Sequence, residues 1–188
     1  MVIGSRGDIQ PFLKIAKILK EQHGHRVRIA SHPVFRDFVQ EEEGLEFFSV
    51  GGDPAELMAF MVNNPGLVPH LATIREGEIQ RRRSAMAMMF EGFWRASTNI
   101  RDGEEDVENL KMMDETDPFV ADCIIANPPS MAHVHIAEKL GIPLHMMQVL
   151  SLRRSNGLLI LAQVHVSLHS PHSNSLILWR ISSHTGTR

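Results

Sequence analysis

The chain has 188 residues, a formal net charge of −3 at pH 7 and a pI near 6.4. This length is enough for one domain with a hydrophobic core. The slightly acidic balance argues against general nucleic-acid binding, which needs a basic face. The single cysteine, Cys123, excludes an intramolecular disulfide and fits a reducing compartment. Since no apolar run is typical of a membrane span or a secretory signal, we expect a cytoplasmic protein, with peripheral membrane contact left open.

The first residues predict a strand, a turn and a helix. Val2 and Ile3 are typical of the end of a buried strand, and residues 4–8 form a turn bracketed by glycines. Ligands of α/β sheets bind at the carboxyl ends of the strands. The hydroxyl, cation and carboxylate of this turn are therefore candidates for handling a polar, phosphorylated substrate. The apolar face of the following helix consists of Ile9, Phe12, Leu13, Ala16 and Leu19.

Two further strands and a helix follow. We expect a chain reversal at Gly24, a strand of alternating polarity over 26–30, a helix from Pro33 to Gly44, and a strand over 45–50. Three histidines at the ends of these elements are expected to face solvent, namely His23, His25 and His32.

The middle of the chain predicts two helices and a linker. Asp53-Pro54-Ala55-Glu56 is a helix start, and periodicity predicts a longer helix over 76–100. Within the longer helix, the basic triplet 81–83 favours a solvated face, with contact to anionic lipid as the alternative. Its apolar residues over 86–94 favour core, with a ligand groove as the alternative. The acidic stretch 101–117 predicts a solvated linker or loop.

The second half predicts one more strand–helix–strand unit. The apolar run 119–126 is typical of a strand buried on both faces of a parallel sheet, with Cys123 as a small apolar filler. Ser130 is expected to cap a helix over 131–140, which Gly141 ends before a strand over 142–149. These repeated units predict the α/β class with a doubly wound parallel sheet. Residues 148–188 predict a tail of little regular structure, with a weak strand pattern over 158–166.

Several motifs are absent or ambiguous. The dinucleotide pattern G-x-G-x-x-G and the phosphate-loop pattern G-x-x-x-x-G-K-[ST] do not occur, which argues against an NAD enzyme or a P-loop NTPase. His133 and His135 are two residues apart on a predicted helix, so they face different sides and no metal site is expected. Asp8 has two open roles. Spacing alone favours a helix N-cap, and the alternative is a general base that takes a proton from an acceptor hydroxyl.

Five segments carry a resemblance to a known family. In chain order they are GSRGDIQP (4–11), GHRVRIA (24–30), FFSVGGDP (47–54), IIANPPS (124–130) and AEKLGIP (137–143). Together they resemble the N-terminal domain of sterol 3-beta-glucosyltransferases, fungal ones especially, and more broadly UDP-glycosyltransferases of two facing Rossmann-like domains (the GT-B arrangement). The resemblance covers residues 1–147, which it identifies as an acceptor-side domain.

The resemblance implies inverting transfer of glucose from UDP-glucose to the 3-hydroxyl of a sterol. Asp8 would be the general base, the role proposed for the matching aspartate of antibiotic glycosyltransferases. Ser5 and Arg6 would approach the departing diphosphate or the acceptor, because a hydroxyl and a guanidinium stabilise negative charge. Apolar residues over 64–94 are candidates for a sterol groove. The implied partners are a sterol and a UDP-sugar, with no cofactor and no metal.

The sequence also departs from this family. Its first strand is short, and residues 148–154 replace the Trp- and Pro-containing segment that leads into the family's donor domain. The family's His-Gly-Gly donor motif does not occur in these 188 residues. We therefore expect a truncated product, from a frameshift, a retained intron or a pseudogene, that binds the UDP-sugar only through a missing C-terminal domain and has little activity alone. The alternative is a non-catalytic lipid-binding or interaction module with the same fold.

Overall fold

The computed structural model describes residues 1–56, 59, 78–154 and 157–167, and the chain divides into two compact units. The first unit is Met1–Ala121 and the second begins at Asp122. Each contains helices and a small sheet with a parallel strand pair, so the α/β class is confirmed. No described helix is long and apolar enough to cross a membrane.

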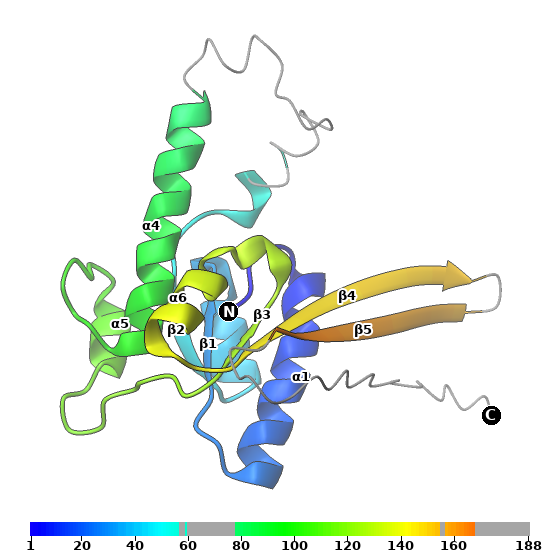
Figure 1. Ribbon diagram of the computed structural model, residues 1–188, viewed down its shortest axis with the longest axis horizontal. Helices are drawn as coiled ribbons and strands as arrows, with labels where there is room; N and C mark the ends of the chain where they lie inside the picture. The colour runs from blue at the N-terminus through cyan, green and yellow to red at the C-terminus, as the bar shows by residue number, and fades with distance from the viewer. Residues whose placement is uncertain (57–58, 60–77, 155–156, 168–188) are drawn as a thin grey trace. The chain divides into compact units, whose positions relative to one another are not determined.

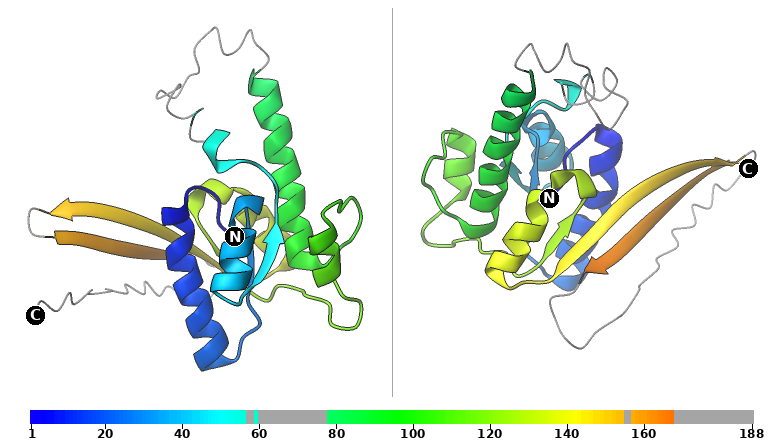
Figure 2. Two further views of the ribbon diagram at one scale, coloured as in Figure 1. Left: turned by 180° about the vertical axis from the view of Figure 1, so that it is seen from behind. Right: turned by 45° about the horizontal axis from the view of Figure 1, so that its top comes forward.

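A parallel strand pair lies at the centre of the first unit. β1 (Arg28–Ser31) pairs with β2 (Glu46–Ser49) from Arg28 opposite Glu46 to Ser31 opposite Ser49. Helices α1 (Arg6–His23) and α4 (Glu78–Thr98) flank this pair in every view (Figures 1 and 2). The shorter helical elements are η1 (Pro33–Phe35), the π-helical turn η2 (Phe38–Glu42) and α5 (Val107–Met112).

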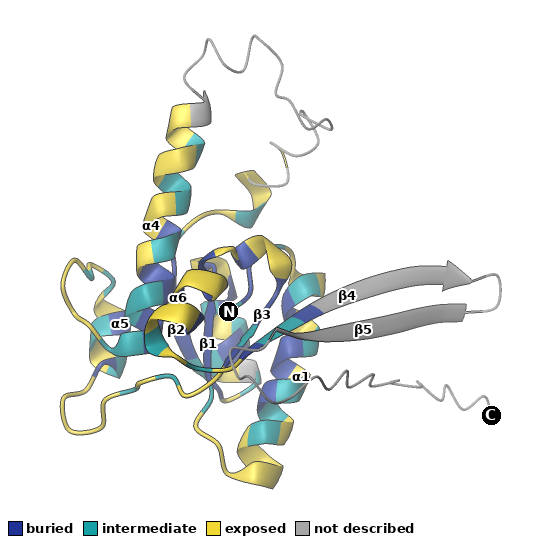
Figure 3. Cartoon of the chain, in the orientation of Figure 1, coloured by how far each residue is buried: buried dark blue, intermediate teal, exposed yellow. Residues whose placement is uncertain are grey.

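Apolar side chains of these elements form the core around the strand pair (Figure 3). Phe47 and Phe48 of β2 and Phe93 of α4 are fully buried. The predicted face of α1 is confirmed except for Leu19, which is half-buried; its buried residues are Ile9, Phe12, Leu13 and Ala16. α4 begins and ends within two residues of the predicted bounds, and its buried Met89 and Phe93 pack as core.

Three expectations for the first unit were wrong. No strand forms at Val2, although its N–H donates to the Ala30 carbonyl oxygen (3.0 Å). β1 does not alternate in burial: all four residues are buried, including Arg28, whose guanidinium carbon lies 4.1 Å from the Phe119 ring centroid. The region 33–44 contains short 3-10 and π-helical turns in place of a regular helix.

The remaining predictions on this unit are mixed. Gly24 ends α1 in the left-handed conformation as expected, with φ 67°. A helix does begin at Pro54, where the Asp53 carboxylate accepts a hydrogen bond from the Ala55 N–H (2.8 Å). The apolar positions predicted to follow it, Leu57, Phe60 and Met61, lie outside the described residues, as does the part of the suggested sterol groove over 64–77.

The second unit has a mixed three-stranded sheet. β3 (Ile124–Ala126) pairs parallel with β4 (Leu144–Arg154), and β4 pairs antiparallel with β5 (Gly157–Ser167). The turn η3 (Pro128–Ser130) and α6 (Ala132–Leu140) connect β3 to β4 (Figure 1). Both strand pairs within residues 1–147 are parallel, as expected. The antiparallel strand β5 belongs to the tail and coincides with the weak strand pattern over 158–166.

Predictions for the second unit failed mainly at its two ends. Only the last three residues of the apolar run 119–126 form a strand, and Cys123 is exposed and is not a core filler. Residues 148–154 and 157–167 are strand, although we expected little regular structure over 148–188; residues 168–188 lie outside the described part. The domain boundary at Met147 stays a prediction, since β4 passes through it without a break.

Candidate functional site

The turn from Gly4 to Asp8 is built around one carboxylate. Ser5 is the N-cap residue of α1, and Asp8 is the third residue of the helix. Oδ2 of Asp8 accepts hydrogen bonds from the Ser5 backbone N–H (2.7 Å) and from Ser5 Oγ (2.8 Å). The prediction that Asp8 is itself the N-cap was therefore wrong. Asp8 supplies the reciprocal half of a capping box, which satisfies a backbone donor ahead of the helix.

The second oxygen of this carboxylate, Oδ1, is uncommitted among the described residues. Both hydrogen bonds that the described part of the chain makes to Asp8 end on Oδ2, and none reaches Oδ1. The side chain is half-buried. Gly4 leaves room for it, because a Cβ on Gly4 would lie 2.5 Å from Oδ2 and the residue has φ 127°. The carboxylate is thus held in place by one oxygen, and the other can accept a proton.

Ser5 and Arg6 also have partners within the protein. Ser5 is exposed, and its hydroxyl hydrogen is donated to Asp8. The guanidinium carbon of Arg6 lies 4.1 Å from the centroid of the Phe38 ring, a distance typical of a cation–π contact. The structure therefore brings the three predicted site residues onto one turn, and it gives Ser5 and Arg6 contacts that spacing could not predict. Their role as substrate-binding residues stays a prediction.

Three chain segments end side by side at this edge of the first unit. The Val2 N–H bonds to Ala30 O, and the Val50 N–H bonds to Ser31 O (2.9 Å), which continues the parallel pairing past the last residues of β1 and β2. By this register Ile3 lies beside His32, and His32 lies beside Val50. The turn of Asp8, the end of β1 and the Gly51–Gly52 turn are consequently neighbours, at the sheet edge where α/β proteins bind ligands.

His32 does not face solvent, which corrects the prediction for that residue; His23 and His25 are exposed as expected. The His32 side chain is 1% exposed, and its Nδ1–H donates to the Gly51 carbonyl oxygen at 3.0 Å. Burial lowers the pKa of His32, while hydrogen bonds to the backbone of Gly51 and Gly52 and the charge of Asp53 oppose that shift. The imidazole is therefore neutral at pH 7.

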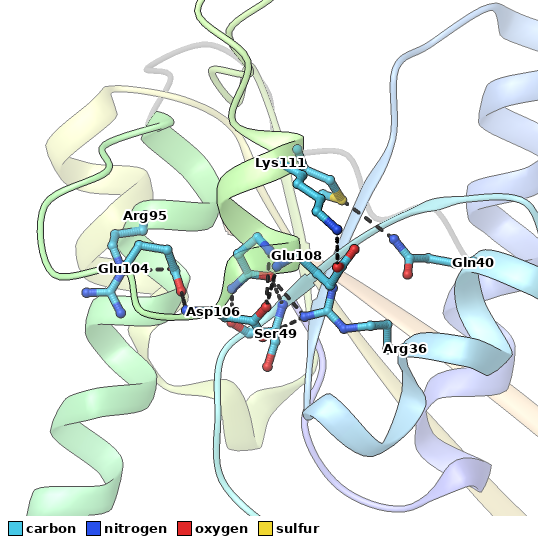
Figure 4. Close-up of polar contacts among 10 residues, drawn as sticks. Arg36, Gln40, Ser49, Arg95, Glu104, Asp106, Glu108 and Lys111 are labelled. Atoms are coloured by element: carbon cyan, nitrogen blue, oxygen red, sulfur yellow. Dashed lines mark hydrogen bonds and ion pairs between the residues drawn. The ribbon is translucent and has the colours of Figure 1, made fainter.

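The acidic stretch 101–117 is only in part the predicted solvated linker or loop, because α5 lies within it and docks on β2. Asn109 of α5 is fully buried. Its Oδ1 accepts from the Ser49 N–H and its Nδ2 donates to the Ser49 carbonyl, both at 2.9 Å. Asp106 caps α5 and binds Arg36 Nη2 through Oδ2 (2.6 Å), as Figure 4 shows. We call Arg36, Ser49, Asp106 and Asn109 the α5 clamp.

Sequence reasoning missed the α5 clamp because its partners lie far apart in the chain. Ser49 and Asn109 are 60 residues apart, and Arg36 and Asp106 are 70 apart. The one local signal is Asp106 itself, which precedes the short apolar pattern of α5 and accepts from the N–H groups of Glu108 and Asn109 as an N-cap does.

Polar residues of the second unit are mainly structural. Ser130 is not a helix cap: its hydroxyl donates to Asn127 O (2.8 Å) and lies 2.9 Å from His133 Nδ1. His133 is buried and His135 is exposed, so the two face different sides as predicted. Within the described ranges, no three His, Cys, Asp or Glu side chains are grouped in a way that could hold a metal ion.

Residues 1–157 match the glycosyltransferase family 28 N-terminal domain. The chain is 44% identical over 146 residues to a sterol 3-beta-glucosyltransferase of Arabidopsis thaliana, covering 78% of this chain and 21% of that protein. It is 37% identical over 143 residues to a sterol 3-beta-glucosyltransferase of Eremothecium gossypii, covering 76% and 10%. A terpene cyclase-glycosyl transferase fusion protein of Humicola fuscoatra is 40% identical over 148 residues, covering 77% and 11%.

These relatives are much longer proteins. The chain spans about a fifth of the Arabidopsis protein and about a tenth of the two fungal ones. The similarity extends across both compact units, since the family match runs from residue 1 to residue 157.

Proposed function

Because the chain belongs to glycosyltransferase family 28, whose N-terminal domain it contains, we propose that it is the acceptor-binding part of a sterol glucosyltransferase. The Arabidopsis and Eremothecium relatives are sterol 3-beta-glucosyltransferases, which supports a sterol as acceptor and glucose as the transferred sugar. The family membership supports the Rossmann-like, two-domain arrangement expected from the sequence. In that arrangement, UDP-glucose would be held by sequence outside these 188 residues.

The observation that carries the proposal is the uncommitted oxygen of Asp8. Oδ2 is held by Ser5, and Oδ1 is left to accept the proton of the sterol 3-hydroxyl. The sterol oxygen then forms a bond to the anomeric carbon of glucose from the side opposite the phosphate. The bond from that carbon to the diphosphate breaks, UDP leaves with the electron pair, and the configuration inverts.

Ser5 has a different part in this proposal from the one the resemblance implies. Because its Oγ hydrogen is donated to Asp8 at 2.8 Å, Ser5 orients the base. A hydroxyl can donate only one hydrogen, so the departing diphosphate would have to draw that hydrogen away from Asp8. The cation of Arg6 remains the candidate for contact with the diphosphate.

A chimeric enzyme tests the proposal. Residues 1–147 replace the matching segment of the Arabidopsis relative, and transfer of glucose from UDP-glucose to a sterol is measured. We expect the chimera to form sterol glucoside, and Asp8→Asn to lower kcat by about 10²- to 10⁴-fold, the usual contribution of a general base. The asparagine keeps an oxygen that can accept from Ser5, so the helix start is preserved.

Two results would contradict the proposal. If the chimera and its Asp8→Asn variant turn over equally fast, Asp8 is not the base. If the chimera binds a sterol but forms no glucoside while the Arabidopsis parent is active, the chain is a lipid-binding module.

The 188-residue chain by itself is expected to form no detectable glucoside, and robust formation would show that it holds a nucleotide-sugar site of its own.

A further inference from the structure

His32 is a buried histidine that the proposed chemistry does not use. It lies directly after β1, its side chain is 1% exposed, and it is enclosed on several sides. The Phe35 ring centroid is 6.4 Å from that of His32. A Cβ on Gly52 would lie 3.2 Å from His32 Nδ1 and 2.7 Å from Met89 Sδ, so the backbone at Gly52 lies close to both side chains.

The two ring nitrogens of His32 are in different states. Nδ1 must carry the hydrogen, because the Gly51 carbonyl 3.0 Å away can only accept. Burial lowers the pKa of the ring, so Nε2 has no proton at pH 7 and is a hydrogen-bond acceptor. Within the described residues Nε2 is buried and has no partner. Buried acceptors in native proteins nearly always have one, so a bound water or ligand is expected there.

The position of His32 links this acceptor to the proposed base. Ile3, which precedes the Gly4–Asp8 turn, is the register neighbour of His32, and neighbouring strands lie about 4.8 Å apart. Two acceptors, Oδ1 of Asp8 and Nε2 of His32, therefore follow adjacent chain segments that are joined by the hydrogen bond from Val2 to Ala30. Together they require two hydrogen-bond donors, which hydroxyl groups can supply.

We propose that His32 Nε2 accepts a hydrogen bond from a hydroxyl of the transferred sugar. This inference rests on the proposed function. The 3-hydroxyl of a simple sterol has one hydrogen, which goes to Asp8, whereas glucose in UDP-glucose carries four free hydroxyls. Nε2 is shielded from solvent when no ligand is bound, so the contact requires a side-chain shift on binding. Met89, whose Sδ lies 2.7 Å from the position of a Cβ on Gly52, is a flexible side chain close to the His32 ring.

Matched variants in the chimeric enzyme separate the two nitrogens of His32. His32→Asn keeps a donor for the Gly51 carbonyl and removes the Nε2 acceptor. His32→Gln reaches the Nε2 position with an amide oxygen and gives up the Nδ1 donor. Each variant and the unchanged chimera are assayed with UDP-glucose and with its 2-, 3-, 4- and 6-deoxy analogues. The control is Ser31→Ala at the preceding residue. It removes a buried hydroxyl that has no hydrogen-bond partner in the described part of the chain.

We expect one deoxy analogue to lose about threefold to tenfold in kcat/KM in the unchanged chimera, the value of one neutral hydrogen bond. His32→Asn should lower kcat/KM for UDP-glucose by the same factor. UDP-glucose and that analogue should then have equal kcat/KM in this variant. His32→Gln and Ser31→Ala should keep the difference.

Two outcomes would overturn the inference. In the first, kcat/KM of His32→Asn still differs between UDP-glucose and the affected deoxy analogue as much as it does in the unchanged chimera. In the second, the unchanged chimera has the same kcat/KM for all four deoxy analogues as for UDP-glucose. This outcome does not depend on whether a variant folds. Both require an active chimera, so they are distinct from failure of the proposed function, in which the chimera is inactive or Asp8→Asn has no effect.

Discussion

The Gly4–Asp8 turn and the α5 clamp use the same kinds of group for different purposes. Each joins a carboxylate, an arginine and a small polar residue. The contacts of Asp8 in the turn span three residues, are exposed, and leave one carboxylate oxygen uncommitted. In the α5 clamp the contacts span 60 to 73 residues, and Asn109 is fully buried with both amide atoms engaged.

The difference separates a candidate site from a structural element. A polar group that is fully paired and buried contributes to stability and has no capacity left for a ligand. A partly paired group at a strand end keeps that capacity. By this criterion the turn can bind or react, whereas Asn109 holds α5 to β2. Within the α5 clamp, Nη1 of Arg36 is buried and has no hydrogen-bond partner among the described residues.

The largest effect on stability is expected from the α5 clamp. Asn109→Leu has similar volume but leaves the N–H and the carbonyl of Ser49 without partners, which should lower the free energy of unfolding by about 2–4 kcal/mol. Urea unfolding measures this change. The control is Glu108→Gln on the exposed side of the same helix, with an expected change below about 0.5 kcal/mol. Equal, small effects would show that the α5 clamp is not structural.

A second prediction concerns the pH dependence of stability and involves His32. Burial lowers its folded-state pKa below the usual 6.5, so the unfolded chain binds more protons as the pH falls. The contribution of neutral His32 to the free energy of unfolding is fully present above about pH 6.5 and declines below it. The free energy of unfolding then falls by at most about 1.4 kcal/mol per pH unit. Unfolding between pH 7.5 and 5 measures the slope, and His32→Asn should reduce it. An identical slope in that variant would rule out His32 as its source.

The smallest effect is expected in the turn. Ser5→Ala removes the hydrogen bond from Oγ to Asp8 and keeps the one from the backbone N–H, so the cost should be about 1 kcal/mol. In the chimera it should lower kcat, because Asp8 is less firmly oriented, and Ser5→Thr should restore most of the loss. A kcat for Ser5→Ala equal to that of the unchanged chimera would limit Ser5 to a structural role.

The sequence predicted best the elements whose signals are local. The apolar face of α1, the left-handed Gly24 and the extent of α4 follow from periodicity and capping rules within one segment. The same rules placed Ser5, Arg6 and Asp8 on one turn. They assigned the N-cap to Asp8 instead of Ser5, because both residue types suit that position and only the backbone geometry distinguishes them.

The failures depend on contacts between distant segments. His32 is buried because the Gly51–Gly52 turn and Met89 enclose it, and neither is near it in sequence. The stretch 101–117 is acidic enough to be typical of a solvated linker, yet one asparagine within it finds a strand 60 residues away. Polarity alone cannot distinguish a residue that faces water from one that pairs with a backbone.

Asn109 also has a consequence for association with other chains. An outer strand normally offers unpaired N–H and carbonyl groups to which a strand of another molecule can add. At Ser49 of β2 both groups are already taken by the Asn109 amide, which imitates the next strand with a single side chain. Edge-to-edge polymerisation through this position is thereby blocked, so the same residue that fastens α5 also protects the sheet from aggregation.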